Sequence, residues 1–184
     1  MTDLLRRSLE DPGFAPLPPR ARELLESLGA PPRLGAHLRL VHDVAVTLTG
    51  WVRADFDVPA VLFGAATHDI GKILHPAELS GPGSLHEVAG YSLLLSQGIE
   101  EASARFARTH GSWDAADVTF EDLLVSLADK VWKGKRVPEL EQRVTARLGG
   151  PAWETFLALD DELERIAAGA DARLAFQAAY PTTG

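Results

Sequence analysis

Apolar residues recur at intervals of three and four along most of this chain, and this periodicity limits the possible folds more than any other feature. The clearest run predicts a helix over about Arg33–Arg53, and its apolar face consists of Leu34, Leu38, Val41, Ala45, Leu48 and Val52. Val, Ile and Thr do not gather into alternating runs, as strands would require. The pattern therefore predicts an all-α protein.

Proline, glycine and capping residues divide the rest of the chain into further helices. Asp11–Pro19 is too rich in proline to remain helical. The segment Ser84–Leu85–His86–Glu87 fits a capping box at the start of a helix. The other expected helices cover Thr2–Leu9, Pro19–Leu28, Pro59–Leu74, Ser84–Gln97, Ile99–His110, Phe120–Lys133, Pro138–Leu148 and Pro151–Phe176. No repeat or long linker divides the 184 residues, so we expect a single compact domain.

Composition excludes several classes of function. The formal net charge of −8 argues against binding to a nucleic-acid duplex, although a small anionic substrate remains compatible with a local cationic site. The chain has no cysteine, so any metal must be held by histidine and carboxylate ligands. The longest apolar stretch, Val58–Thr67, is far shorter than the ~20 residues that span a bilayer. We expect a cytoplasmic protein without membrane contact, whose oligomeric state stays open, a homodimer included.

The strongest local signal is the segment Thr67–His68–Asp69–Ile70–Gly71–Lys72. The apolar stripe of the preceding helix continues directly onto His68 and Asp69, which places an imidazole and a carboxylate where apolar side chains had pointed inward. A buried carboxylate needs a partner charge, and a divalent metal ion would supply one. Two adjacent ligands can reach one ion if it lies over the end of the helix, which Gly71 would provide.

Four other residues have a similar placement on later or earlier helices: His42, His86, His110 and Asp129. Each one alone is as well explained by a structural histidine or a solvated aspartate. The order His, His-Asp, His, His, Asp on successive helices is far less common by chance. His37, at the centre of the apolar face of its helix, is expected to be structural.

This motif order resembles that of the HD-domain superfamily of metal-dependent phosphohydrolases, over roughly Ala36–Arg136. The resemblance implies an HD-domain fold with a metal-binding core at 33–136, an N-terminal helical extension and connector at 1–32, and C-terminal helices at 137–184 that pack on the core. It also implies one or two divalent ions, of Fe, Mn, Ni, Co, Zn or Mg. The first ion would bind His42, His68, Asp69 and Asp129, and the second would bind His86 and His110, with Asp69 as the bridge.

Within that superfamily, the chain lacks the His-His-Glu run and the Gly-Tyr-Pro tripeptide of the cyclic-dinucleotide phosphodiesterases, since it reads Thr109–His110–Gly111–Ser112. Its six ligands fit the bacterial HD-type diadenosine tetraphosphate hydrolases better. The resemblance thus implies hydrolysis of a small phosphorylated substrate of nucleotide type. Asp69 would orient the attacking water, and Lys72 would contact a phosphate oxygen. Two other functions remain open: a nucleotide sensor without turnover, and a di-iron oxygenase of the same fold.

A second basic group follows Asp129 and consists of Lys130, Lys133, Lys135 and Arg136. It suits a phosphate-binding rim, formed mainly by Lys130 and Lys133, and equally the cations that stabilise the carboxyl end of a helix. Trp113 and Trp132 could stack a base, but burial in the core is the commoner fate of such residues.

Overall fold

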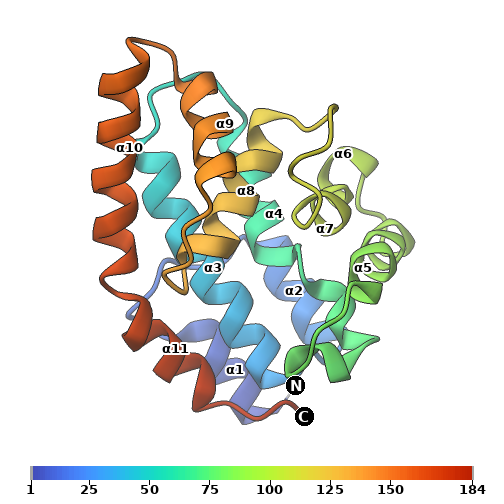
Figure 1. The fold of residues 1–184 in the computed structure, drawn as a ribbon. Coiled ribbons are helices and arrows are strands. Elements are labelled where there is room, and N and C mark those ends of the chain that lie inside the picture. The colour runs from blue at the N-terminus through green and yellow to red at the C-terminus, as the bar shows by residue number, and fades with distance from the viewer. Residues whose placement is uncertain (1, 184) are drawn as a thin grey trace.

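The computed structural model describes residues 2–183, and every regular element within them is a helix (Figure 1). The predicted all-α class is confirmed. The elements are α1 (Asp3–Glu10), α2 (Pro19–Ser27), α3 (Pro32–Trp51), α4 (Val58–Thr67), η1 (Ile70–Ile73), η2 (Pro76–Leu79), α5 (Leu85–Ser96), α6 (Glu101–Ala104), α7 (Phe106–Thr109), α8 (Phe120–Val131), α9 (Pro138–Leu148), α10 (Ala152–Ala167) and α11 (Ala170–Ala178). None of the helices in this part of the chain is both long enough and apolar enough to cross a membrane.

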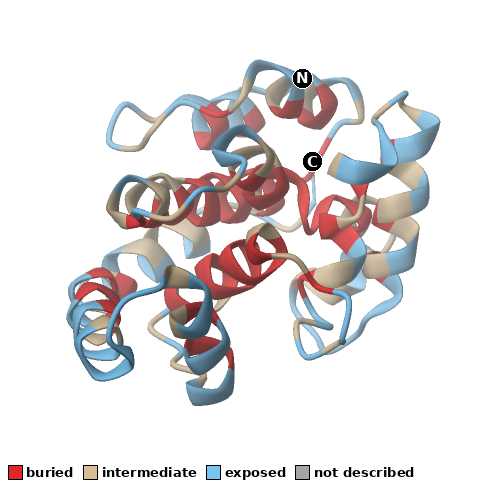
Figure 2. Ribbon diagram, turned by 90° about the horizontal axis from the view of Figure 1, so that it is seen from above, coloured by how far each residue is buried: buried red, intermediate tan, exposed pale blue. Residues whose placement is uncertain are grey.

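Helix α3 is the central element, and it packs against α1, α4, α8 and α11. Buried residues concentrate along the inner helices, whereas the outer helices turn exposed faces to the solvent (Figure 2). Two apolar clusters meet along α3. Leu34 and Leu38 belong to the cluster shared with α1 and α2, and Val41 and Leu48 belong to the cluster shared with α8 and α9.

Several helix boundaries differ from the sequence prediction. Helix α4 ends at Thr67 instead of continuing to Leu74, and a 3-10 turn, η1, follows it. The single helices expected over Ile99–His110 and Pro151–Phe176 are each divided in two. In the second, Gly169 leaves helical geometry between α10 and α11, with φ −90° and ψ 5°.

The capping box predicted at the start of α5 is also wrong. Ser84 makes no side-chain capping hydrogen bond there. The carboxylate of Glu78, in η2, instead accepts hydrogen bonds from the backbone amides of Leu85 and His86, both at 3.2 Å. Amide groups in the first turn of a helix have no partner within the helix, so a carboxylate from an adjoining turn can replace a local cap.

Candidate metal centre

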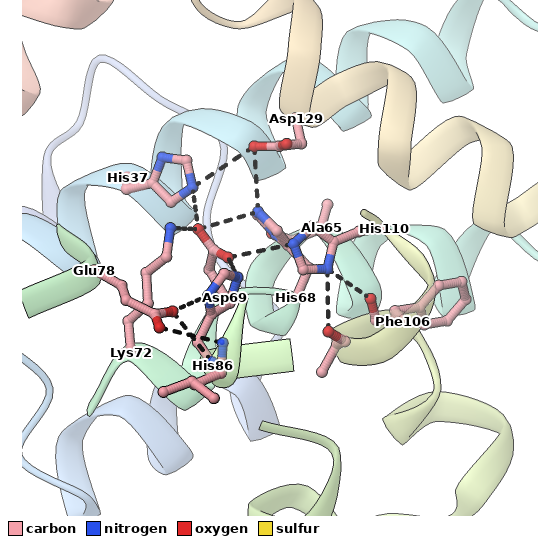
Figure 3. Close-up of polar contacts among 12 residues, drawn as sticks. His37, Ala65, His68, Asp69, Lys72, Glu78, His86, Phe106, His110 and Asp129 are labelled. Carbon is pink, nitrogen blue, oxygen red and sulfur yellow. Dashed lines mark hydrogen bonds and ion pairs between the residues drawn. The ribbon is translucent and has the colours of Figure 1, made fainter. Parts of the chain in front are cut away.

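Five segments bring buried histidine and aspartate side chains to one place between α3, α5 and α8 (Figure 3). Helix α3 contributes one histidine, the α4–η1 junction a histidine and an aspartate, α5 and the end of α7 a histidine each, and α8 an aspartate. All six side chains are buried: His37, His68, Asp69, His86, His110 and Asp129.

The junction between α4 and η1 is built around Gly71. A Cβ atom at this position would collide with the carbonyl oxygen of His86 and the amide of Gly90. Glycine therefore lets the backbone of η1 lie directly against α5. This close approach brings Asp69, the residue before η1, beside the imidazole of His86.

Asp69 is at the centre of the group, and its two carboxylate oxygens face different histidines (Figure 3). Its Oδ2 atom lies 3.0 Å from Nε2 of His37 and 3.7 Å from Nε2 of His68. Its Oδ1 atom lies 2.9 Å from Nε2 of His86 and 3.4 Å from Nε2 of His110. Each oxygen of this one carboxylate thus faces its own pair of imidazoles.

Asp129 lies beside the first pair of imidazoles, those of His37 and His68. Its Oδ1 atom lies 3.5 Å from Nε2 of His68 and 3.9 Å from Nε2 of His37. Nitrogen and oxygen atoms of His37, His68 and Asp129 all lie within 4.8 Å of one another, as metal ligands would. The same is true of His68, Asp69 and His110.

Hydrogen bonds fix which nitrogen of each ring faces the centre. Nδ1 of His68 lies 3.0 Å from the carbonyl oxygen of Ala65, and Nδ1 of His110 lies 3.1 Å from that of Ala107. A carbonyl oxygen only accepts, so each Nδ1 carries the proton and each Nε2 keeps its lone pair for the centre. The Nε2 atoms of His37, His68 and His86 are buried without a hydrogen-bond partner among residues 2–183. Converging buried lone pairs fit a divalent cation.

The two aspartates remain charged in this setting. Burial alone would raise the pKa of Asp69, but the electrostatic interaction with the His68 imidazole and the hydrogen bonds with His110, His37 and His86 hold that pKa well below its ordinary value. Burial likewise opposes ionisation of Asp129, and here the His68 imidazole and the Lys130 ammonium outweigh it and lower the pKa. Both carboxylates are therefore available as anionic ligands at neutral pH.

One residue predicted as a metal ligand lies away from the others. His42 does not join the group, because it follows His37 by five residues and so lies about 140° further around α3. It lines a largely apolar cavity of about 620 Å³ with the proline-rich segment before α2. Burial and the neighbouring Arg39 lower the pKa of His42 to about 4, so its imidazole is neutral. The imidazole of His37, which was expected to be structural, lies beside Asp69 and Asp129, where His42 was expected.

The three lysines predicted to bind substrate differ in position. Nζ of Lys72 lies 2.5 Å from Oδ2 of Asp69, and Nζ of Lys130 lies 2.7 Å from Oδ2 of Asp129. Both side chains keep 18% of their surface exposed, so their ammonium groups border the centre and reach solvent. Lys133 is exposed and lies apart from this group, with Nζ 6.0 Å from the ring centre of Trp132. Trp132 itself is buried beside the ring of His37.

Glu78 is a residue of the site that the sequence did not indicate. Its Oε2 atom lies 2.5 Å from Nδ1 of His86, in addition to the bonds that cap α5. This carboxylate accepts the Nδ1 proton and turns Nε2 of His86 toward Asp69, the usual arrangement around a metal-binding histidine. The His86 hydrogen bond is the main reason that the pKa of Glu78 is lowered. Sequence patterns could not identify Glu78, because it lies eight residues before His86 in a turn without periodicity.

Comparison with known families agrees with this geometry. The family model described as the HD domain matches residues 21–132, which is more than half of the chain. The chain belongs to the HD domain family. The matched segment contains all six of these buried side chains as well as Lys72, Glu78 and Lys130. The protein is therefore an HD-domain phosphohydrolase with a candidate His/Asp metal site. Neither the curated proteins nor the solved structures gave a match.

Proposed function

We propose that this HD-domain protein hydrolyses a phosphoester or phosphoanhydride bond of a small, nucleotide-like substrate at a pair of divalent metal ions. The observation that carries the proposal is the position of Asp69, whose two oxygens face separate pairs of imidazoles at 2.9–3.7 Å. A carboxylate so placed can bridge two ions. Bridged pairs of ions are a common device for phosphate hydrolysis.

The ligand set divides into two groups. The first ion would be held by His37, His68, Asp129 and Oδ2 of Asp69. The second would be held by His86, His110 and Oδ1 of Asp69. Ions of Fe, Mn, Ni, Co, Zn or Mg are all compatible with nitrogen and carboxylate oxygen ligands. When bound, the ions would neutralise phosphate oxygens and lower the pKa of the attacking water.

The remaining residues handle the charge of the substrate. A phosphate ester repels nucleophiles because it is already anionic, so cationic groups near its oxygens assist the reaction. The ammonium groups of Lys72 and Lys130 border the centre and remain partly exposed to solvent, so they are the proposed contacts for non-bridging oxygens. Lys133, further out, would attract the anionic substrate in a protein whose formal net charge is −8.

The nucleotide part of the proposal rests on the likeness of the ligand set to that of the HD-type diadenosine tetraphosphate hydrolases. The segment around His110 lacks the His-His-Glu run of the cyclic-dinucleotide phosphodiesterases. A linear nucleotide or dinucleoside polyphosphate is therefore the proposed substrate class.

A substrate screen with defined metals tests the proposal. The protein is stripped with chelator, reloaded with each metal in turn, and assayed for phosphate release from nucleoside phosphates, dinucleoside polyphosphates and cyclic dinucleotides. We expect turnover of a linear nucleotide and none in Asp69→Asn, which keeps the side-chain shape and removes the bridging charge. Tight nucleotide binding by loaded protein without any release would favour a sensor, and substrate-dependent oxygen consumption with iron would favour an oxygenase.

A further inference from the structure

Glu87 follows the candidate ligand His86 on α5, and the structure removes the structural role that the sequence suggests for it. In a capping box, Glu87 would return to the start of its helix and bond the backbone amide there. The start of α5 has no such cap, and the carboxylate of Glu78 takes the hydrogen bonds from its first amides. The position of Glu87 therefore needs another explanation.

The carboxylate of Glu87 lies at the second pair of imidazoles. One of its oxygens and one nitrogen each of His86 and His110 lie within 4.8 Å of one another. It also lies against the turn that follows His110, because a Cβ atom at Gly111 would be 2.5 Å from Oε1 of Glu87. Glycine at position 111 thus provides the space that the carboxylate occupies. The side chain is only half-buried, so it has room to adjust its reach.

The proposed ligand sets are unequal without Glu87. The first ion has two imidazoles, one oxygen of Asp69 and a carboxylate of its own from Asp129. The second ion has two imidazoles and the other oxygen of Asp69, with no carboxylate of its own. A divalent ion held by fewer anionic groups binds more weakly, because carboxylates supply both lone pairs and compensating charge.

We propose that Glu87 is a ligand of the second metal ion and gives it the same donors as the first, two imidazoles and two carboxylates. This inference rests on the proposed two-ion function, and it adds a residue to that site. Its consequence is specific: the affinity of the second ion depends on Glu87, whereas the affinity of the first ion does not.

Titration with Mn²⁺ tests this assignment without any substrate. The chelator-stripped full chain is titrated calorimetrically, and wild-type protein should bind two ions. Glu87→Gln keeps the size of the side chain and removes its charge, so we expect the second Kd to rise by about 10-fold or more with the first Kd unchanged. Gly111→Ala should act in the same direction, since its Cβ displaces the Glu87 carboxylate while leaving its chemistry intact.

Two controls bracket the result. Glu101→Gln removes an exposed carboxylate that bonds the Tyr91 hydroxyl, and it should leave both affinities unchanged. Asp129→Asn should weaken the first ion instead of the second. Unchanged affinities in Glu87→Gln, or equal weakening of both ions, would overturn the assignment. Wild-type protein that binds one ion overturns it as well, whereas wild-type protein that binds none rejects the proposed metal-dependent function itself.

Discussion

Nε2 of His37 lies 3.0 Å from Oδ2 of Asp69, so α3 contributes His37, and not His42, to the candidate metal centre. The imidazole of His37 also lies 3.9 Å from Asp129, which places it among the ligands proposed for the first ion. His42 is on another face of the same helix, beside an apolar cavity. The two histidines therefore form a matched pair for testing the site.

Replacing His37 and His42 separately with Leu should give opposite results for metal binding. His37→Leu removes a nitrogen ligand of the first ion, so we expect bound metal to fall by about one ion per chain. His42→Leu places an apolar side chain against a largely apolar cavity, away from the proposed ligands, so metal content should equal that of wild type. Elemental analysis after dialysis against trace chelator measures both. Loss of metal in His42→Leu alone would restore the assignment made from the sequence.

The sequence could not show which of these two histidines faces the site, and the reason is physical. Periodicity identifies the buried face of a helix when another face is exposed. Of the 20 residues of α3, 13 are buried, and they include both His37 and His42. A helix surrounded on most sides offers no exposed face as a reference, so the sequence places both histidines inside without indicating which neighbour each one meets.

Periodicity also decides which other residues of the site could be predicted from the sequence. The His68-Asp69 pair could be predicted because an apolar stripe in one helix leads directly to it, and both residues, which come directly after α4, are indeed buried. Glu78 could not, since its partners His86 and Leu85 are brought to it by the turn between η2 and α5. A local alternative, the Ser84–Glu87 capping box, also accounted for the same helix start.

Glu78→Ala should reduce both stability and metal affinity. The substitution removes the two hydrogen bonds that the first amides of α5 donate to Glu78, so we expect the urea midpoint of unfolding to fall. It also releases Nδ1 of His86, and loss of such a partner typically weakens metal binding by about 10–100-fold. Urea unfolding in chelator measures the first effect, and Mn²⁺ titration measures the second. A loss of stability with unchanged metal affinity would show that Glu78 acts only as a helix cap.

Lys72→Ala should lower kcat/KM by about 10²–10³, the size associated with one lost donor to a developing charge. Metal content should not fall, because a charged ammonium has no lone pair for a metal, and removing it frees Oδ2 of Asp69. Lys135→Ala removes the same charge from an exposed position and serves as the control. If Lys72→Ala retains wild-type kcat/KM, the ammonium only balances the charge of Asp69 and has no contact with substrate.

Stability should fall in mildly acidic solution because of His42. Its pKa is about 4 in the folded protein, lowered from about 6.5 by burial and by Arg39. Between these values the unfolded chain binds a proton that the folded chain does not, so the free energy of unfolding decreases as the pH falls through this range. The full difference corresponds to about 3 kcal/mol, an upper limit for one group.

The variant His42→Leu isolates this contribution. Its free energy of unfolding should fall less than that of wild type between about pH 7 and about pH 4.5, with the two curves diverging below about pH 6.5. Urea unfolding in the presence of chelator measures both proteins without bound metal.

The raised pKa of His86 acts in the opposite direction, since the stability it provides is lost as the pH rises, but it is common to both proteins. Asp69 and Asp129, with lowered pKa values, lose their contribution only below the ordinary range of an aspartate. Parallel curves for the two proteins would mean that His42 accepts a proton in the folded state as readily as in the unfolded one, and its imidazole would then have to reach water or an anion.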